Sequence, residues 1–117
     1  MNLDRGEIVL IDVQFHQQPG SKIRPAVVVL DTGDGDFVAV PITSRQRTGA
    51  FEVSIEQWRE AGLNTASIMR VHKIAVLPKL AVRRRLGRLS ANDSGAFRSA
   101  ISHTYCSQAS PTGPTTL

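Results

Sequence analysis

Apolar and polar residues follow each other along this chain in the short, alternating runs that are typical of β-strands. Residues 7–15 alternate so that Ile8 and Val9 would lie on opposite faces of a first strand. The β-branched run over residues 24–31 predicts a buried strand, in which Pro25 can stand only at the start because it donates no ladder hydrogen bond. The same pattern predicts further strands over residues 37–43, 51–55, 67–72, 74–77 and 82–89.

Turn and capping residues separate these runs and mark two helices. Residues 32–36 (TGDGD) predict a hairpin turn. Ser54 is placed to cap a short helix through residues 57–61, which Gly62 would end. Ser90, with Asp93 three residues later, is a capping pattern that predicts a helix over residues 91–105. The apolar stripe of that helix would consist of Phe97, Ala100, Ile101, Thr104 and Tyr105.

These elements predict a mainly β domain with a C-terminal helix. Many short strands joined by Gly and Pro turns favour a small, strongly bent antiparallel sheet or a partly open barrel. The 117 residues fit one domain, which we expect to span residues 1–106. The remaining Ser/Thr/Pro-rich stretch, residues 107–117, is expected to be a flexible tail.

Composition excludes several classes of protein. With 41% hydrophobic and 21% charged residues, the chain is not expected to be disordered. Its longest apolar runs are too short to cross a bilayer, and residues 1–7 lack the apolar core of a secretory signal. We therefore expect a cytoplasmic protein with no membrane partner. Cys106 is the single cysteine, so neither an internal disulfide nor a cysteine-built metal site can form.

The charge is distributed unevenly. Residues 70–98 hold eight basic residues and one acid, a net +7, whereas the rest of the chain holds six basic and nine acidic residues, a net −3. A basic third on a nearly neutral body suggests a polyanionic partner such as nucleic acid. The alternative is a solvated strand face carrying arginines.

The residues with useful chemistry lie at predicted strand ends. Arg24 stands at the start of one strand, Thr43 and Ser44 end another, and Arg70 and His72 would project from one face of a third. Cleavage of RNA through its 2′-hydroxyl needs a proton acceptor, a proton donor and fixed positive charge around the phosphate. Guanidinium and imidazole groups suit these tasks, and no metal or other cofactor is required.

A structural role is the alternative for each of these residues. Arg24 would then form an ion pair with Asp12 or Glu52, and Thr43 would be an ordinary strand residue. His72 would be a partly buried histidine that donates to a backbone carbonyl. The histidines are far apart in sequence and show no metal-ligand spacing, and the sequence contains no phosphate-binding glycine loop.

In the order and spacing of several segments, the chain resembles the MazF/PemK family, the toxins of bacterial toxin–antitoxin pairs. The matching segments are RGEIVLIDV, GSKIRPAVVVL, VPITS, SIMRVHKIAVLPK and RRLGRLS, which together span about residues 5–105. The resemblance implies an SH3-like β-barrel with a terminal helix that works as a homodimer. It also implies a metal-independent, sequence-selective endoribonuclease that acts on single-stranded RNA and leaves a 2′,3′-cyclic phosphate and a 5′-hydroxyl. A cognate antitoxin with an acidic tail would block the RNA groove.

The resemblance assigns roles to particular residues. The family's arginine before proline corresponds to Arg24, its strand-end threonine to Thr43, and the arginine of its Arg-x-Asp pattern to Arg70. The acidic position of that pattern is His72 here, which we predict to be the general base. The RNA-binding groove would be lined by His16, Gln17, Lys22, Ser44, Arg45, Lys73 and Arg84.

Two other functions are compatible with the same barrel. It resembles that of CcdB, a toxin that traps DNA gyrase through protein contacts, and it would also serve as a nucleic-acid-binding domain without catalysis. The departure at His72 keeps both alternatives open.

Overall fold

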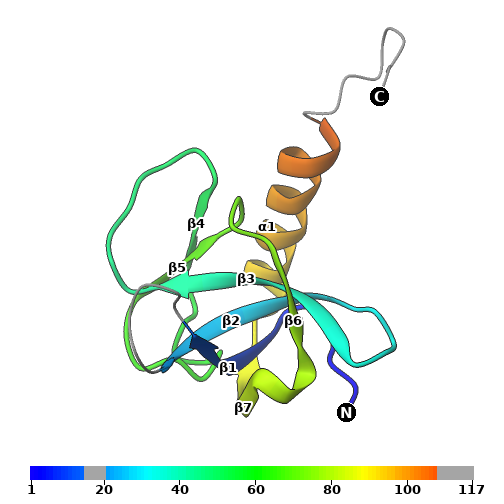
Figure 1. Ribbon diagram of the computed structural model, residues 1–117. Helices are drawn as coiled ribbons and strands as arrows, with labels where there is room; N and C mark the ends of the chain where they lie inside the picture. The colour runs from blue at the N-terminus through cyan, green and yellow to red at the C-terminus, as the bar shows by residue number, and fades with distance from the viewer. Residues whose placement is uncertain (15–20, 108–117) are drawn as a thin grey trace, which may run out of the picture.

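The computed structural model, which describes residues 1–14 and 21–107, consists of an antiparallel sheet with one C-terminal helix (Figure 1). This confirms the predicted fold class. The strands are β1 (Glu7–Gln14), β2 (Ser21–Asp31), β3 (Asp36–Thr43), β4 (Glu52–Ile55), β5 (Ser67–Arg70), β6 (Ala75–Pro78) and β7 (Val82–Arg88). A 3-10 turn, Lys79–Ala81, precedes β7, and α1 (Ala91–Ser102) continues as a π-helical turn, His103–Ser107.

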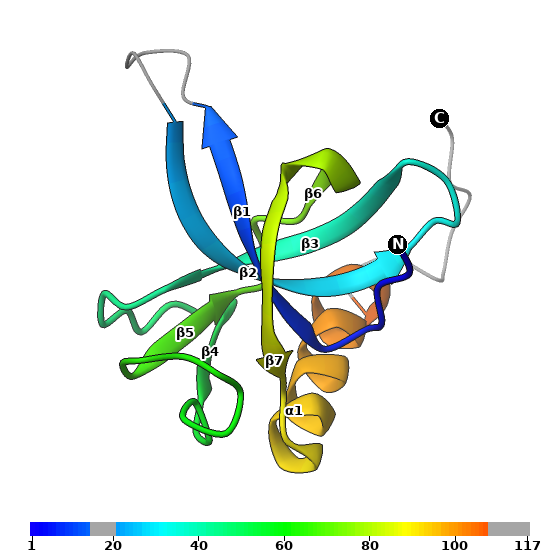
Figure 2. The same ribbon diagram turned by 90° about the horizontal axis from the view of Figure 1, so that it is seen from below.

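Strand β3 is the centre of the sheet. The hydrogen-bonded order is β4-β5-β3-β2-β1-β7, with β6 paired to β3 outside this path. The first half of β3 pairs with β6 on the side away from β2, and its last residues pair with β5 on that side. In Figure 2 the β1–β2 hairpin and the β4–β5 pair project away from each other, which shows how strongly the sheet bends about β3.

Both faces of the sheet are buried. One face carries the larger core cluster, which includes Ile8, Val40 and Met69 and is covered by Phe97 of α1. The opposite face carries a second cluster that includes Val9, Val28, Phe37 and Ala39. The alternation in β1 therefore supplies apolar residues to both clusters, because successive strand residues point to opposite faces.

Two glycines bring the far ends of the sheet together. Gly62, in the segment after β4, has a φ of +92°, and a Cβ there would lie 2.5 Å from the carbonyl oxygen of Leu86 on β7. A Cβ on Gly87 would lie equally close to the carbonyl oxygen of Ala61. The backbone after β4 thus crosses β7 at a distance that only glycine allows.

The buried carboxylate of Asp93 fixes this closure to the helix. Asp93 is 1% exposed. Its two carboxylate oxygens accept hydrogen bonds from the backbone N–H groups of Glu56 and Gln57, at 3.0 and 2.9 Å. Its own backbone N–H donates to Ser90 Oγ at 3.1 Å, which confirms Ser90 as the N-cap of α1. One carboxylate therefore joins the start of α1 to the turn that follows β4.

A second carboxylate anchors the N-terminal segment. Asp31, at the end of β2, accepts hydrogen bonds from the backbone N–H groups of Leu3 and Gly33 and pairs with Lys79 at 2.8 Å. The hydrogen bond from Lys79 and those from the two backbone N–H groups hold the pKa of Asp31 well below its usual range. The β2–β3 hairpin, residues 1–6 and the 3-10 turn are thus held at one point.

Several predicted element boundaries are wrong. Strand β2 begins at Ser21, so Pro25 lies inside the strand. The pairing of β2 with β3 begins only at Ala26. On the β3 side, Pro25 therefore lies at an unpaired strand edge, where a residue without an N–H group is tolerated.

The predicted short helix over residues 57–61 is absent, and residues 56–62 form consecutive turns. The backbone hydrogen bonds in this segment each close a single turn, for example from Ala61 N–H to Gln57 O at 3.2 Å and from Gly62 N–H to Arg59 O at 3.1 Å. The donors that would begin such a helix, Glu56 and Gln57 N–H, are directed to Asp93. Within the described ranges, no helix has the length and apolar character needed to cross a membrane.

We expect Asp93→Ala to lower the free energy of unfolding by about 3 kcal/mol, because it leaves the backbone N–H groups of Glu56 and Gln57 without their charged acceptor and removes part of the α1 cap. Urea denaturation followed by circular dichroism measures the change. Asn92→Ala, one residue away but exposed, should change it by no more than about 0.5 kcal/mol. Equal stability of the two variants would contradict this assignment.

Candidate functional site

Three of the four predicted catalytic residues lie on one face of neighbouring strands. Arg24 on β2 and Thr43 on β3 each lie two residues beyond the register pair Ala26–Pro41. Arg70 on β5 lies one residue beyond the pair Met69–Ile42, which puts it level with Pro41. Because side chains alternate along strands, these residues share the face opposite to the core cluster that α1 covers.

This face forms a cavity of about 260 Å³ that is rich in guanidinium groups. Arg24, Thr43 and Arg70 line it together. The loop after β3 adds Arg45, a predicted RNA-binding residue, and Arg47, which the sequence analysis missed. The residue type of Arg47 is visible in the sequence, but its place in an irregular loop gives no periodic signal. Four positive side chains around one small cavity make it a site for an anion with several oxygens.

The hydroxyl of Thr43 is held in a fixed position at the edge of this cavity. Thr43 Oγ1 accepts a hydrogen bond from the backbone N–H of Arg45 at 3.1 Å. A hydroxyl that accepts one bond keeps its own proton for donation. Thr43 can therefore donate to an oxygen of a bound anion.

Arg70 forms an ion pair with a carboxylate on the next strand. Glu52, the first residue of β4, is the register partner of Arg70, and Glu52 Oε2 lies 3.7 Å from Arg70 Nε. The two side chains are 9% and 24% exposed. Because the ion pair is formed through Nε, the two terminal guanidinium nitrogens of Arg70 can serve another ligand. Glu52 is a further residue next to the site, and its partner is Arg70, whereas the structural alternative for Arg24 considered Glu52 as a partner of Arg24.

His72 does not join this group. The prediction of a strand through residues 67–72 is wrong, because β5 ends at Arg70 and residues 71 and 72 form a turn closed by Lys73 N–H to Arg70 O at 3.1 Å. His72 and Arg70 therefore do not alternate on one strand face. The His72 ring packs on Phe51 with 5.7 Å between centroids, and its buried Nδ1 has no hydrogen-bond partner among the described residues.

The turn that carries His72 is tied to the end of the C-terminal helix. Tyr105 donates a hydrogen bond from its hydroxyl to the carbonyl oxygen of Val71 at 2.5 Å. Val71 N–H in turn donates to Phe51 O at 2.9 Å. The predicted apolar stripe of α1 thus ends in a residue that holds the backbone directly after Arg70.

A second cavity, of about 250 Å³, continues from the first. The two share Arg24, Ile42, Thr43 and Arg45. Its other walls come from Pro25, the predicted residue Ser44, Ser67 at the start of β5, and the loop before β5, which supplies Leu63, Asn64 and Thr65. This loop carries no motif or periodic pattern in the sequence that marks it as part of a site.

The remaining predicted RNA-binding residues are not brought to these cavities. Lys22 on β2, Lys73 in the turn after β5 and Arg84 on β7 are exposed but line neither of them. Strand β7 is separated from β2 by β1. His16 and Gln17 lie outside the described residues.

Most of the basic segment is neutralised within the fold. Five of its eight basic residues form ion pairs, each with an acid from outside the segment: Arg70–Glu52, Lys79–Asp31, Arg83–Asp12, Arg85–Glu7 and Arg88–Asp4. Burial alone raises the pKa of Glu7, but the hydrogen bond from Arg85 and other favourable contacts outweigh it and leave that pKa lowered. The uneven charge along the sequence thus largely reflects pairing between strands.

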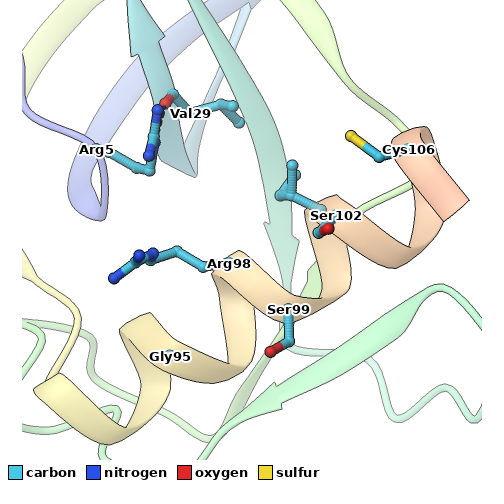
Figure 3. Close-up of a pocket in the computed structure, with 8 residues that line it drawn as sticks. Arg5, Val29, Gly95, Arg98, Ser99, Ser102 and Cys106 are labelled. Atoms are coloured by element: carbon cyan, nitrogen blue, oxygen red, sulfur yellow. Dashed lines mark hydrogen bonds between the residues drawn. The ribbon is translucent and has the colours of Figure 1, made fainter.

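A larger cavity, of about 490 Å³, lies apart from these residues. Figure 3 shows it between α1, which contributes Arg98, Ser99 and Ser102, and β2, which contributes Val29. Arg5 donates a hydrogen bond from Nε to the carbonyl oxygen of Val29 at 2.9 Å at its edge. None of the predicted site residues lines it. Across residues 1–14 and 21–107, no three His, Cys, Asp or Glu side chains are grouped as a metal site.

The fold and the arginine cavity define a small, mainly β domain with a cavity lined by four guanidinium groups. Residues 4–105 match the family described as the PemK-like, MazF-like toxin of type II toxin–antitoxin systems. The match covers most of the chain, so this protein belongs to that family. No curated protein sequence matches the chain significantly.

Solved structures share the fold at low sequence identity. An endoribonuclease in complex with its cognate antitoxin, from a mycobacterial species, has a TM-score of 0.71 at 20% identity over 92% of this chain and 97% of its own. A MazE–MazF complex from Deinococcus radiodurans has a TM-score of 0.70 at 22% identity, over 87% and 94%. The Mycobacterium tuberculosis toxin MazF-mt6 has a TM-score of 0.65 at 23% identity, over 83% and 95%.

Proposed function

We propose that this protein is an endoribonuclease that cleaves single-stranded RNA through the 2′-hydroxyl next to the scissile phosphate. The 2′ oxygen would bond to phosphorus while the bond from phosphorus to the 5′ oxygen breaks, giving a 2′,3′-cyclic phosphate and a 5′-hydroxyl. The observation that carries this proposal is the convergence of Arg24, Arg45, Arg47 and Arg70 with the Thr43 hydroxyl around one cavity. Membership of the MazF-like family supports it.

Charge stabilisation is the main task in such a reaction, because the phosphate gains negative charge in the transition state. Arg24 and Arg70 would hold its oxygens, with Arg70 using its terminal guanidinium nitrogens. Guanidinium groups keep their protons, so these arginines would act through their charge and not as proton donors. Thr43 would donate to a phosphate oxygen or hold the attacking hydroxyl.

The proposed reaction is independent of metal ions. Divalent cations assist phosphoryl chemistry by neutralising charge on the phosphate oxygens and by orienting the substrate. Four guanidinium groups around one cavity supply the same positive charge from the protein. We therefore expect chelation to leave the activity unchanged.

Purified protein should cleave a long single-stranded RNA in the presence of EDTA, and Arg24→Ala and Arg70→Ala should each reduce the rate about 10²- to 10³-fold, because each removes charge stabilisation at the phosphate. Gel analysis with mapping of the 5′-hydroxyl ends measures this. Arg88→Ala removes the same charge from an exposed residue paired with Asp4 and should match the wild type. RNA that is bound but stays intact would favour the non-catalytic domain, and a trapped gyrase–DNA complex would favour the CcdB-like function.

We propose His72 as the proton acceptor. It does not line the arginine cavity, but it lies in the turn directly after Arg70, and its Nδ1 has no hydrogen-bond partner among the described residues. The 2′-hydroxyl would therefore have to bind at this turn, beside the cavity. His72→Gln should then lower the cleavage rate about 100-fold at pH 7, because glutamine cannot take up the proton of the 2′-hydroxyl. His103→Gln, at the end of α1, is the matched control. A wild-type rate for His72→Gln would show that another group accepts the proton.

We further propose that the chain forms a homodimer and binds an acidic antitoxin. Val76 and Leu80 are apolar residues that are 67% and 96% exposed, as expected of a surface covered by a second copy. Arg5 and Arg98 line the 490 Å³ cavity, which no acidic residue lines. That cavity would suit an acidic segment of a partner.

Light scattering after gel filtration should give a molar mass of twice the 12.7 kDa of one chain. Leu80→Glu should lower the measured mass to that of the monomer, because it puts a charge into the apolar surface. Co-expression with the adjacent reading frame should add an acidic protein to the complex, and Arg98→Glu should weaken that complex while the dimer persists. A monomeric wild-type chain would contradict the dimer. An adjacent product that does not bind would contradict the antitoxin assignment.

A further inference from the structure

We propose that the 250 Å³ cavity beside the arginine cavity binds one nucleobase of the RNA and that Asn64 reads its edge. This inference rests on the proposed function, because it names the part of the same substrate that lies next to the phosphate. The two cavities share Arg24, Ile42, Thr43 and Arg45 as a common wall. A phosphate in the first would therefore direct the adjoining nucleoside into the second.

The lining of this cavity suits a base more than a second phosphate. Pro25, Ile42 and Leu63 are apolar surfaces against which the faces of a base can pack. The polar groups on the other side, from Ser44, Asn64 and Thr65, are neutral. Its volume lies below the roughly 300–1,000 Å³ of pockets for larger ligands.

Asn64 has the chemistry and the freedom to read a base edge. Its exposed amide makes no hydrogen bond to the described residues, so both its donor and its acceptor are available. A side-chain amide pairs with a base edge that presents a donor beside an acceptor, and single-stranded RNA exposes such edges. No aromatic side chain lines the cavity, so recognition would depend on hydrogen bonds.

The loop that carries Asn64 is held at both ends. Before it, Gly62 crosses β7 at contact distance, and Leu63 N–H donates to Trp58 O at 3.0 Å. After it, the buried Ser67 donates from Oγ to the carbonyl oxygen of Thr65 at 2.9 Å. A loop fixed in this way loses little conformational freedom when a ligand binds, which favours selective recognition.

Binding and cleavage are measured separately to test this. The full-length protein is mixed with a pool of random RNA octamers whose sugars carry 2′-fluorine and therefore cannot be cleaved, and the bound sequences are determined. At one position of the bound RNA, the wild type should prefer one base by about tenfold. Asn64→Ala should abolish the preference at that position and leave base preferences at the other positions unchanged. Asn92→Ala, a matched exposed asparagine on α1, should keep it.

Cleavage of an all-ribose transcript by the same proteins is then mapped at its 5′-hydroxyl ends. Selective binding that Asn64→Ala flattens supports the base site even if the wild type cleaves nothing, in which case only the proposed function fails. An Asn64→Ala variant that binds and cleaves with unchanged selectivity overturns the base site and leaves the nuclease in place. Absence of any base preference in the wild type also overturns it.

Discussion

The Asp93 carboxylate is the interaction on which the rest of this fold depends. It lies at the start of α1, yet its two oxygens are used by backbone N–H groups of the turn after β4. That turn leads to Gly62 and its close passage over β7. The buried carboxylate, with both oxygens hydrogen-bonded, thus joins the helix to both ends of the sheet. The segment that it holds leads along the chain into the loop with Asn64 and then into strand β5 with Arg70.

Much of the fold could be predicted because local patterns agree with it. The alternation in β1, the β-branched run of β2 and the cap at Ser90 each specify an element within a few residues of themselves. The false helix over residues 57–61 shows the limit of such patterns. Its first backbone donors are used by Asp93, more than thirty residues away, and no local signal could reveal that competition.

The site could be predicted where it depends on strand register and not where it depends on loops. Arg24, Thr43 and Arg70 lie at strand ends that antiparallel pairing brings level. His72 was misplaced because β3 exchanges β5 for β6 as its neighbour, so the chain must turn after Arg70. Arg47 and Asn64 lie in loops without periodicity, where the residue type is visible but its direction is set by distant packing.

The ion pairs along β7 have a consequence for how strongly salt would weaken binding of a nucleic acid. Each phosphate that a protein cation neutralises on a single strand adds about −0.7 to the slope of log affinity against log salt concentration. Arg83, Arg85 and Arg88 already have carboxylate partners, so they would displace few counterions from a bound strand. The four arginines that line the arginine cavity would contact one strand together, and four such contacts correspond to a slope of about −3. Such a protein would depend on a few placed contacts more than on its overall positive charge for affinity. The bound nucleic acid would then dissociate readily at cellular ionic strength.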